Sequence, residues 1–164
     1  MRSIITFVFV ILFLQTYATE QSGDKLIFKS DTMYIYNYPL DSLIKTVPPL
    51  EKKIINYSYT RCGSSDCWRG YIGTWVIQND KLYLIKLTNG CEDYTFNLEK
   101  LFNRKTENGR IFADWFSSEI KTEYSFKEIL INGFTQYLPQ KQLIAKIKDG
   151  TITELIIKDL TNDQ

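Results

Sequence analysis

Two long stretches with strand character, joined by a two-residue turn, constrain the fold of this chain more than any other feature. Residues 69–78 read RGYIGTWVIQ and residues 81–89 read KLYLIKLTN, with Asn79 and Asp80 between them. β-Branched and aromatic residues favour strands, and both Asn and Asp accept the positive φ angles of a tight hairpin turn. The sequence therefore predicts a central antiparallel hairpin.

The turn also sets the register of this hairpin. Setting the last residue of the first stretch against the first residue of the second places Trp75 opposite Leu84 and Ile72 opposite Leu87. Both faces of the hairpin are then largely apolar. A sheet that is apolar on both faces is covered on both sides, so we expect this hairpin to lie at the centre of the domain.

Further hairpin patterns lie on each side of the central one. Residues 25–29 and 33–38 flank a Ser-Asp turn, and residues 142–148 and 151–158 flank an Asp-Gly dipeptide that is typical of tight hairpins. The chain has no heptads, no internal repeat and no helical pattern longer than two turns. The sequence predicts a mostly β domain, an antiparallel sheet built of hairpins and arranged as a sandwich or an open barrel, with little helix.

Two other segments carry weaker signals. Residues 41–44 are predicted to form one helical turn, and Pro48-Pro49 after them predicts an extended connection, because proline restricts its own backbone and that of the residue before it. Residues 129–134 are predicted to form a short element that is broken by Asn132-Gly133.

The first 18 residues have the pattern of a cleavable signal peptide. Arg2 precedes an apolar run over residues 4–14, and Thr16 and Ala18 provide the small side chains required before a cleavage point. The run is shorter than a membrane-spanning helix, although a buried helix or a retained anchor is the alternative. We expect residues 1–18 to be removed and residues 19–164 to form a single β-rich domain, periplasmic or secreted, without a transmembrane segment.

Charge and composition exclude several functions. The chain has 20 basic and 19 acidic residues, and loss of Arg2 with the signal peptide leaves it neutral. Nucleic-acid binding usually requires a basic excess, so we expect no nucleic-acid partner. The chain contains no histidine, which excludes Ser-His-Asp and Cys-His nucleophiles and the common zinc sites. No cofactor and no metal site are expected.

The three cysteines predict a disulfide, because an exported protein meets oxidising conditions. Cys67 precedes the central hairpin and Cys91 follows it. The predicted register places Cys67 opposite Glu92, one residue from Cys91. A single bulge would bring them together. We therefore predict a Cys67–Cys91 bond, while a Cys62–Cys67 bond that closes a small loop is the open alternative.

Aromatic and charged residues near the strand ends are the candidate binding residues. Exposed aromatic rings stack on sugar rings or bases, whereas strand aromatics more often pack in the core. The candidates combine aromatic rings with charged neighbours: Trp68, Arg69, Tyr71, Asp114, Trp115 and Glu119. Two convergent carboxylates would permit glycoside hydrolysis. Gly73 is predicted to leave room for an aromatic ring from a neighbouring strand.

Three segments resemble a family of small, uncharacterised, exported bacterial β-rich proteins. They are RGYIGTWVI over residues 69–77, DKLYL over residues 80–84 and FADWFSSEI over residues 112–120, with Ser118 where that family usually has glycine. The resemblance covers most of the chain after the signal peptide. It implies a bacterial source and a shared fold, and it brings no established activity.

The function expected from the sequence is that of an exported, non-catalytic binding or interaction protein, with a protein or glycan as partner. The absence of catalytic signatures, the small size and the aromatic-rich sheet favour this interpretation. The alternative is a carbohydrate-active enzyme or a glycan-binding module that uses carboxylates and aromatic rings.

Overall fold

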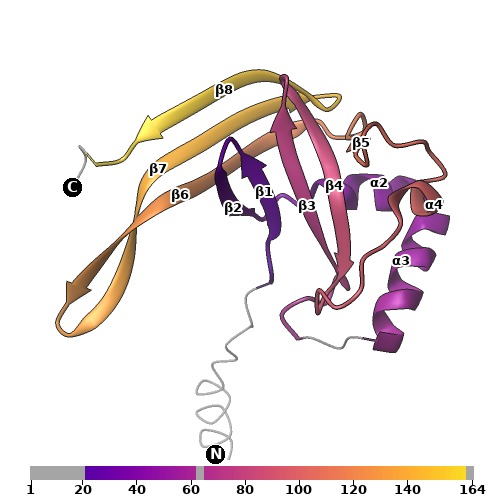
Figure 1. Cartoon of the computed structure of the whole chain (residues 1–164), viewed down its shortest axis with the longest axis horizontal. Helices are drawn as coiled ribbons and strands as arrows, with labels where there is room; N and C mark the ends of the chain where they lie inside the picture. Colours follow the sequence, from indigo (N-terminus) through magenta and orange to yellow (C-terminus); the bar gives the residue numbers. More distant parts are fainter. Residues whose placement is uncertain (1–20, 62–64, 162–164) are drawn as a thin grey trace, which may run out of the picture.

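A single mixed sheet forms the body of the molecule and curls into a nearly closed barrel (Figure 1). The computed structural model describes residues 21–61 and 65–161, with side chains described for 21–55 and 65–161. The predicted signal peptide, residues 1–18, therefore lies outside the described residues. The mostly β fold that the sequence predicts is confirmed.

The sheet has the strand order β2-β1-β3-β4-β8-β7-β6, and the short β5 also pairs with β4. The two end strands of the sheet, β2 and β6, lie close to each other. The Thr122 hydroxyl on β6 donates a 2.7 Å hydrogen bond to the Tyr34 carbonyl on β2. The strands are β1 (Asp24–Phe28), β2 (Asp31–Ile35), β3 (Tyr71–Gln78), β4 (Lys81–Asn89), β5 (Ile111–Phe112), β6 (Ser118–Ile131), β7 (Phe134–Lys148) and β8 (Thr151–Asp159).

Two of the three predicted tight turns are present as predicted, and the third lies one residue earlier, at Lys29-Ser30, with Asp31 as the first residue of β2. Asn79 and Asp80 have φ angles of 50° and 55°, and Asp149 and Gly150 have φ angles of 49° and 74°. Two successive positive φ angles match the twist of the strands that such a turn joins. Local sequence therefore determines both the β3–β4 and the β7–β8 hairpins.

One strand pair is parallel, whereas the sequence predicted only antiparallel pairs. β1 pairs with β3 in parallel, with Lys25 opposite Thr74 and Phe28 opposite Ile77. A parallel pair needs a long crossover between its strands, and the segment between β2 and β3 provides one. The sheet is therefore mixed rather than wholly antiparallel.

Two helices form most of this crossover: α2 (Pro39–Thr46) and α3 (Pro48–Arg61). The predicted turn over 41–44 is thus part of a longer helix, but the extended connection predicted at Pro48 is wrong. Proline fits the first position of a helix, where its missing N–H would have no partner. Leu40, Leu50 and Ile54 bury these helices against the barrel. A third helix, α4 (Leu98–Phe102), is a short segment after β4.

The β3–β4 register shifts by one residue part-way along. Trp75 lies opposite Leu84 as predicted, but a bulge between Thr74 and Trp75 moves Ile72 from the predicted Leu87 to Thr88. The bulge leaves one residue of β4 without a direct partner and changes every pair beyond it. Prediction of the cysteine pairing depended on this part of the register.

The predicted Cys67–Cys91 bond is wrong. Cys67 is a free, buried cysteine, and its thiol donates a 3.3 Å hydrogen bond to the Tyr71 carbonyl. A Cβ added to Gly90 would lie 3.0 Å from the Cys67 sulfur. The thiol therefore packs against Gly90, the residue before its predicted partner Cys91. Cys91 is disulfide-bonded. Because Cys67 is free, the alternative Cys62–Cys67 bond is also wrong; Cys62 itself lies outside the described residues.

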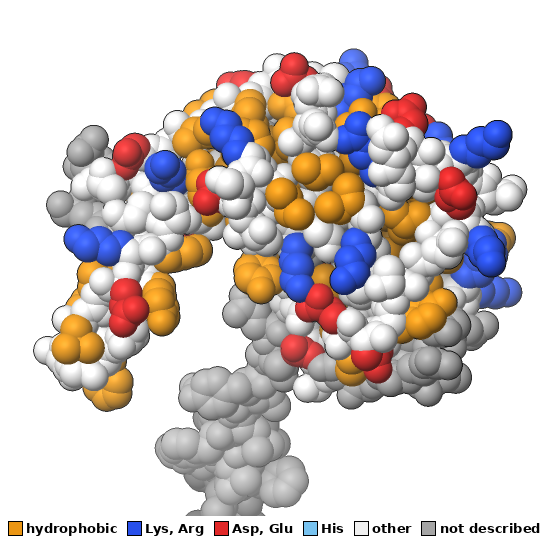
Figure 2. Space-filling view, viewed as in Figure 1, with side chains coloured by type: hydrophobic (Ala, Val, Ile, Leu, Met, Phe, Trp, Pro, Cys, Tyr) orange, Lys and Arg blue, Asp and Glu red, His pale blue; other side chains and the backbone are white. Residues whose placement is uncertain are grey.

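Beyond Tyr124, β6 and β7 leave the barrel as a two-stranded arm (Figure 1). Asn132 and Gly133, with φ angles of 51° and 81°, form the turn at its tip, so the short broken element predicted over 129–134 is the end of a long hairpin. Figure 2 shows apolar side chains gathered on this arm. Its large exposed apolar residues are Phe126, Leu130, Ile131, Phe134 and Tyr137.

The cysteine states can be tested by peptide mapping without reduction. The protein is alkylated in denaturant and cut with trypsin and with a protease that cleaves before Asp66, which separates Cys62 from Cys67. We expect Cys67 to be alkylated and Cys91 to be alkylated only after reduction. A cross-linked peptide that contains Cys67 would contradict the structure.

Candidate functional site

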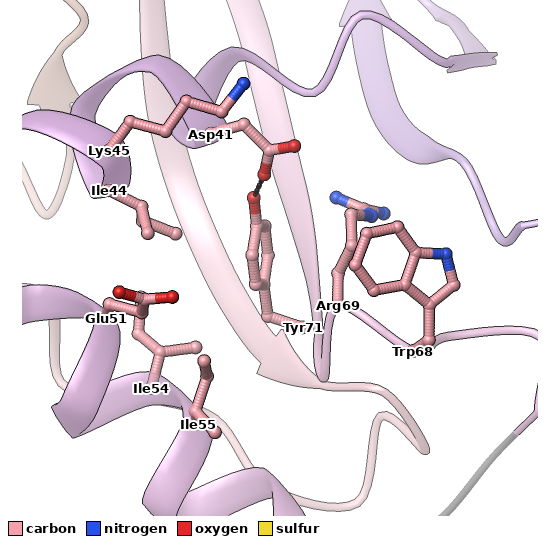
Figure 3. A pocket seen from close by; sticks show the side chains of 9 residues that line it. All are labelled: Asp41, Ile44, Lys45, Glu51, Ile54, Ile55, Trp68, Arg69 and Tyr71. Carbon is pink, nitrogen blue, oxygen red and sulfur yellow. Dashed lines mark hydrogen bonds between the residues drawn. The ribbon is translucent and has the colours of Figure 1, made fainter.

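A pocket of about 340 Å³ lies between the two crossover helices and the start of β3 (Figure 3). We call it the Trp68 pocket. Residues from α2, α3, the segment before β3 and the first residue of β3 line it: Asp41, Ile44, Lys45, Glu51, Ile54, Ile55, Trp68, Arg69 and Tyr71. It combines an apolar wall of isoleucines with charged groups, which is the usual composition of a small-ligand site.

A buried carboxylate behind this pocket fixes the position of Arg69. Asp24, at the start of β1, accepts hydrogen bonds from Trp75 Nε1 at 2.9 Å, the Gly73 amide at 3.0 Å and Arg69 Nη1 at 3.3 Å. The side chains of Asp24 and Arg69 are 0% and 3% exposed. Burial raises the pKa of the Asp24 carboxyl, and the Arg69 guanidinium opposes that rise.

Gly73 is the residue that makes room for this carboxylate. A Cβ at this position would lie 2.6 Å from Trp75 Nε1 and 2.9 Å from Asp24 Oδ2, closer than real Cβ contacts. Glycine was expected to admit an aromatic ring from a neighbouring strand. The ring belongs instead to Trp75 on the same strand, and the neighbouring strand contributes Asp24.

Two tyrosine rings and a backbone carbonyl also contact the Arg69 guanidinium. The guanidinium carbon lies 3.6 Å from the centre of the Tyr38 ring and 4.8 Å from that of Tyr71, and Nη2 donates a 2.9 Å hydrogen bond to the Ser22 carbonyl. Burial lowers the pKa of Arg69, but Asp24 and the two tyrosines together outweigh burial and raise it. Arg69 is therefore a fixed cation whose charge is balanced inside the protein.

Tyr71 links the pocket to α2. Its hydroxyl donates a hydrogen bond to the Asp41 carboxylate, as Figure 3 shows. Burial raises the pKa of Tyr71 far above its ordinary value, and the hydrogen bond with Asp41 adds to this effect. At neutral pH the phenol keeps its proton, so Tyr71 does not supply a base or a nucleophile.

The mouth of the pocket is open and partly aromatic. The side chain of Trp68 lies beside Arg69 (Figure 3), and the residue is 72% exposed. Its backbone N–H donates a 3.2 Å hydrogen bond to the Gln21 side chain, which anchors the residue while leaving its ring in solvent. Lys45 and Glu51 are exposed on the two helices. An apolar group that enters the pocket would meet the isoleucines and the Trp68 ring.

Three of the six predicted binding residues, Trp68, Arg69 and Tyr71, therefore line one pocket. Trp115 lies elsewhere and is half-buried in a structural position. Its ring stacks on Phe102 with centroids 5.9 Å apart, and its Nε1 donates a 3.0 Å hydrogen bond to the Pro39 carbonyl.

Asp114 and Glu119 also lie outside the pocket lining. Both carboxylate oxygens of Asp114 accept hydrogen bonds from Arg104, at 3.0 and 2.6 Å, and these bonds lower the pKa of Asp114. Glu119 is exposed on β6, where its backbone carbonyl accepts a 2.8 Å hydrogen bond from Asn37.

Two residues that organise the site, Asp24 and Asp41, were not found from the sequence. Asp24 belongs to a short apolar strand, and its partners come from a strand that follows two helices. Asp41 has a local signal, because acidic residues are favoured in the first turn of a helix, but that signal does not point to Tyr71.

Within residues 21–61 and 65–161, no group of three or more metal-ligating side chains is found. None of the helices in this part of the chain has the length and apolar character needed to cross a membrane.

Comparisons of the chain with protein-family models, with curated proteins and with solved structures give no match. The resemblance of residues 69–77, 80–84 and 112–120 to small exported bacterial proteins therefore stays a prediction. Arguments about function depend on the geometry of the Trp68 pocket.

The close contact at Gly73 predicts a large cost for the smallest substitution. Gly73→Ala should lower the free energy of unfolding by about 3 kcal/mol, because the new methyl group pushes on Asp24 and Trp75 together. Gly109→Ala is the control: Gly109 has open space around it, and only its positive φ angle costs about 1 kcal/mol. Urea unfolding of both variants measures this difference; equal losses would contradict the argument.

Proposed function

We propose that this domain is an exported, non-catalytic binding protein whose ligand places an apolar group in the Trp68 pocket. The main support is that charged groups at the pocket's inner end are already engaged with each other. Arg69 is paired with Asp24, and Tyr71 donates to Asp41. Groups held in this way position a surface rigidly, and neither the paired guanidinium nor the protonated phenol is a base at neutral pH.

The chemistry at the rim defines the ligand further. Glu51 and Lys45 are exposed at the mouth, and the aromatic ring of Trp68 offers an apolar face on the other side of the pocket (Figure 3). A ring or branched side chain of a partner protein would bury that face and contact Ile44 and Ile55, which are partly exposed. Exposed tryptophans at such positions are frequent binding hot spots.

Glycan binding is the second candidate, and the exposure of Trp68 favours it, because sugars stack on flat indole surfaces. The hydrolytic form of this alternative has less support. Glycoside hydrolysis needs an acid and a second carboxylate at a defined separation. Of the predicted carboxylates, Asp114 is bound to Arg104 and Glu119 is exposed on β6, outside the pocket lining.

Export is supported by the charged start, the apolar run and the small residues within positions 1–18. The disulfide state of Cys91 fits the same compartment, because disulfides persist where conditions are oxidising. Mass spectrometry of the protein purified after expression in a bacterium should find an N-terminus at or near Thr19. Recovery of the full-length chain with Met1 in the membrane fraction would contradict export.

Binding can be tested by ligand-observed NMR with three probes: phenethylamine, phenylacetate and cellotriose. Saturation transfer to a phenyl probe, lost in Trp68→Ala, is expected if the pocket takes apolar groups. Tyr137→Ala is the matched control, because it removes another exposed aromatic ring, 64% exposed, from the distant arm.

The outcomes separate the candidates. Transfer to cellotriose alone, lost in Trp68→Ala, favours the glycan candidate. Signals that survive Trp68→Ala but disappear in Tyr137→Ala would place binding on the arm and contradict the proposed use of the pocket. No transfer to any probe at millimolar concentration would contradict small-ligand binding by this pocket.

A further inference from the structure

Strand β8 has one edge along β7 and a second edge that is largely free. β4 reaches this second edge only at its start, where Lys81 pairs with Thr151 and the Ile152 amide donates to the Asp80 carbonyl. From residue 153 to 159, no described strand pairs with this second edge, although β7 pairs with the first. Figure 1 shows β8 at the outer margin of the molecule. Free strand edges pair readily with other extended chains.

The backbone groups at this edge point outward in a regular pattern. The Leu160 amide donates a 2.8 Å hydrogen bond to the Gln140 carbonyl on the β7 side. Because alternate residues of a strand direct their N–H and C=O groups to opposite edges, those of Asp159, Ile157 and Leu155 point to the free edge. A bulge at Thr153, which has no direct partner on β7, ends this pattern where β4 begins.

The side chains at the free edge continue the apolar inner face of the barrel. Leu155 and Ile157 lie opposite Ala145 and Leu143, which are both fully buried. Leu155 and Ile157 themselves remain 39% and 42% exposed. Directly opposed residues share a face of the sheet, so the core reaches the edge strand and is left uncovered there.

We propose that this edge binds a second copy of the chain, with β8 paired antiparallel to β8 around a two-fold axis at Ile156. In this register Leu155 lies opposite Ile157 of the partner subunit, and Glu154 lies opposite Lys158 of the partner subunit. Both pairs occur twice, as two-fold symmetry requires. The same outward-pointing residues, Leu155 and Ile157, would exchange four backbone hydrogen bonds with the partner.

The charges of β8 select this register over its neighbours. A two-fold ladder sets outward-pointing residues opposite each other, so the nearest alternative registers have their axis at Leu155 or at Ile157. They place Glu154 opposite Ile156 or Leu160 of the partner subunit, and neither forms the pair of Glu154 with Lys158. In the proposed register Glu154 would lie between Lys146, its 2.6 Å partner on β7, and Lys158 of the partner subunit, an alternation of charge that favours pairing.

The test measures self-association by sedimentation equilibrium on the mature domain at protein concentrations from ~1 to ~500 µM. The parent protein should show a monomer–dimer equilibrium, and Lys158→Glu should raise the dissociation constant at least about tenfold, because two like-charged pairs replace two attractive ones. The double variant Glu154→Lys/Lys158→Glu, made in a Lys146→Gln background so that the reversed charge at position 154 meets no lysine on β7, should restore dimerisation, because it re-forms both pairs with their signs exchanged. Lys52→Glu, an exposed charge reversal on α3, is the control and should leave association unchanged.

The substituted side chains are exposed, so we expect the variants to fold, and circular dichroism checks this. A change in association can then be assigned to the interface. A protein that stays monomeric over the whole range would overturn the proposal. A dimer that Lys158→Glu leaves intact would place the interface elsewhere. Failure of the folded double variant to recover would show that Glu154 and Lys158 do not face each other.

Discussion

The buried ion pair between Asp24 and Arg69 is the interaction on which the rest of this structure depends. One carboxylate receives donors from β3, from the Trp75 ring and from the segment before β3. Removing one partner of such a pair leaves an uncompensated charge in the core, which typically costs 3–5 kcal/mol, or about half of a small domain's stability. The Asp24 carboxylate links β1 to its parallel neighbour β3, lies against the space that Gly73 leaves, and holds Arg69 in the wall of the pocket.

The same pair limits what the pocket can do. Arg69 has its charge balanced from behind and tyrosine rings at its sides, so a ligand meets a preformed surface rather than a reactive group. Preformed surfaces bind with little loss of side-chain freedom, because the ordering has already occurred during folding. The ring of Trp68, in contrast, remains exposed, which leaves one adaptable contact at the mouth of an otherwise fixed site.

Local signals in the sequence predicted local structure, and failed where distant segments meet. Asn79-Asp80 and Asp149-Gly150 gave their hairpins directly, because the turn conformation belongs to the dipeptide itself. The parallel pairing of β1 depends on a crossover whose helix α3 begins at prolines, which read equally well as an extended segment. The bulge beside Trp75 changes the strand register on which the predicted Cys67 pairing depended. Trp115 was predicted as a binding residue because its contacts with Phe102 and Pro39 come from distant segments of the chain.

The position of β1 in the sheet has a consequence for the order of folding. Its Asp24 finds its partners 45 to 51 residues further along the chain, and its neighbour β3 is reached only after the two crossover helices. Closing so long a loop costs entropy before any contact repays it, and folds rich in such contacts form slowly. Hairpins β3–β4 and β7–β8 need only adjacent residues and can form first. We therefore expect β1 to join the sheet late, after the segment through Trp75 has formed the strand that receives it.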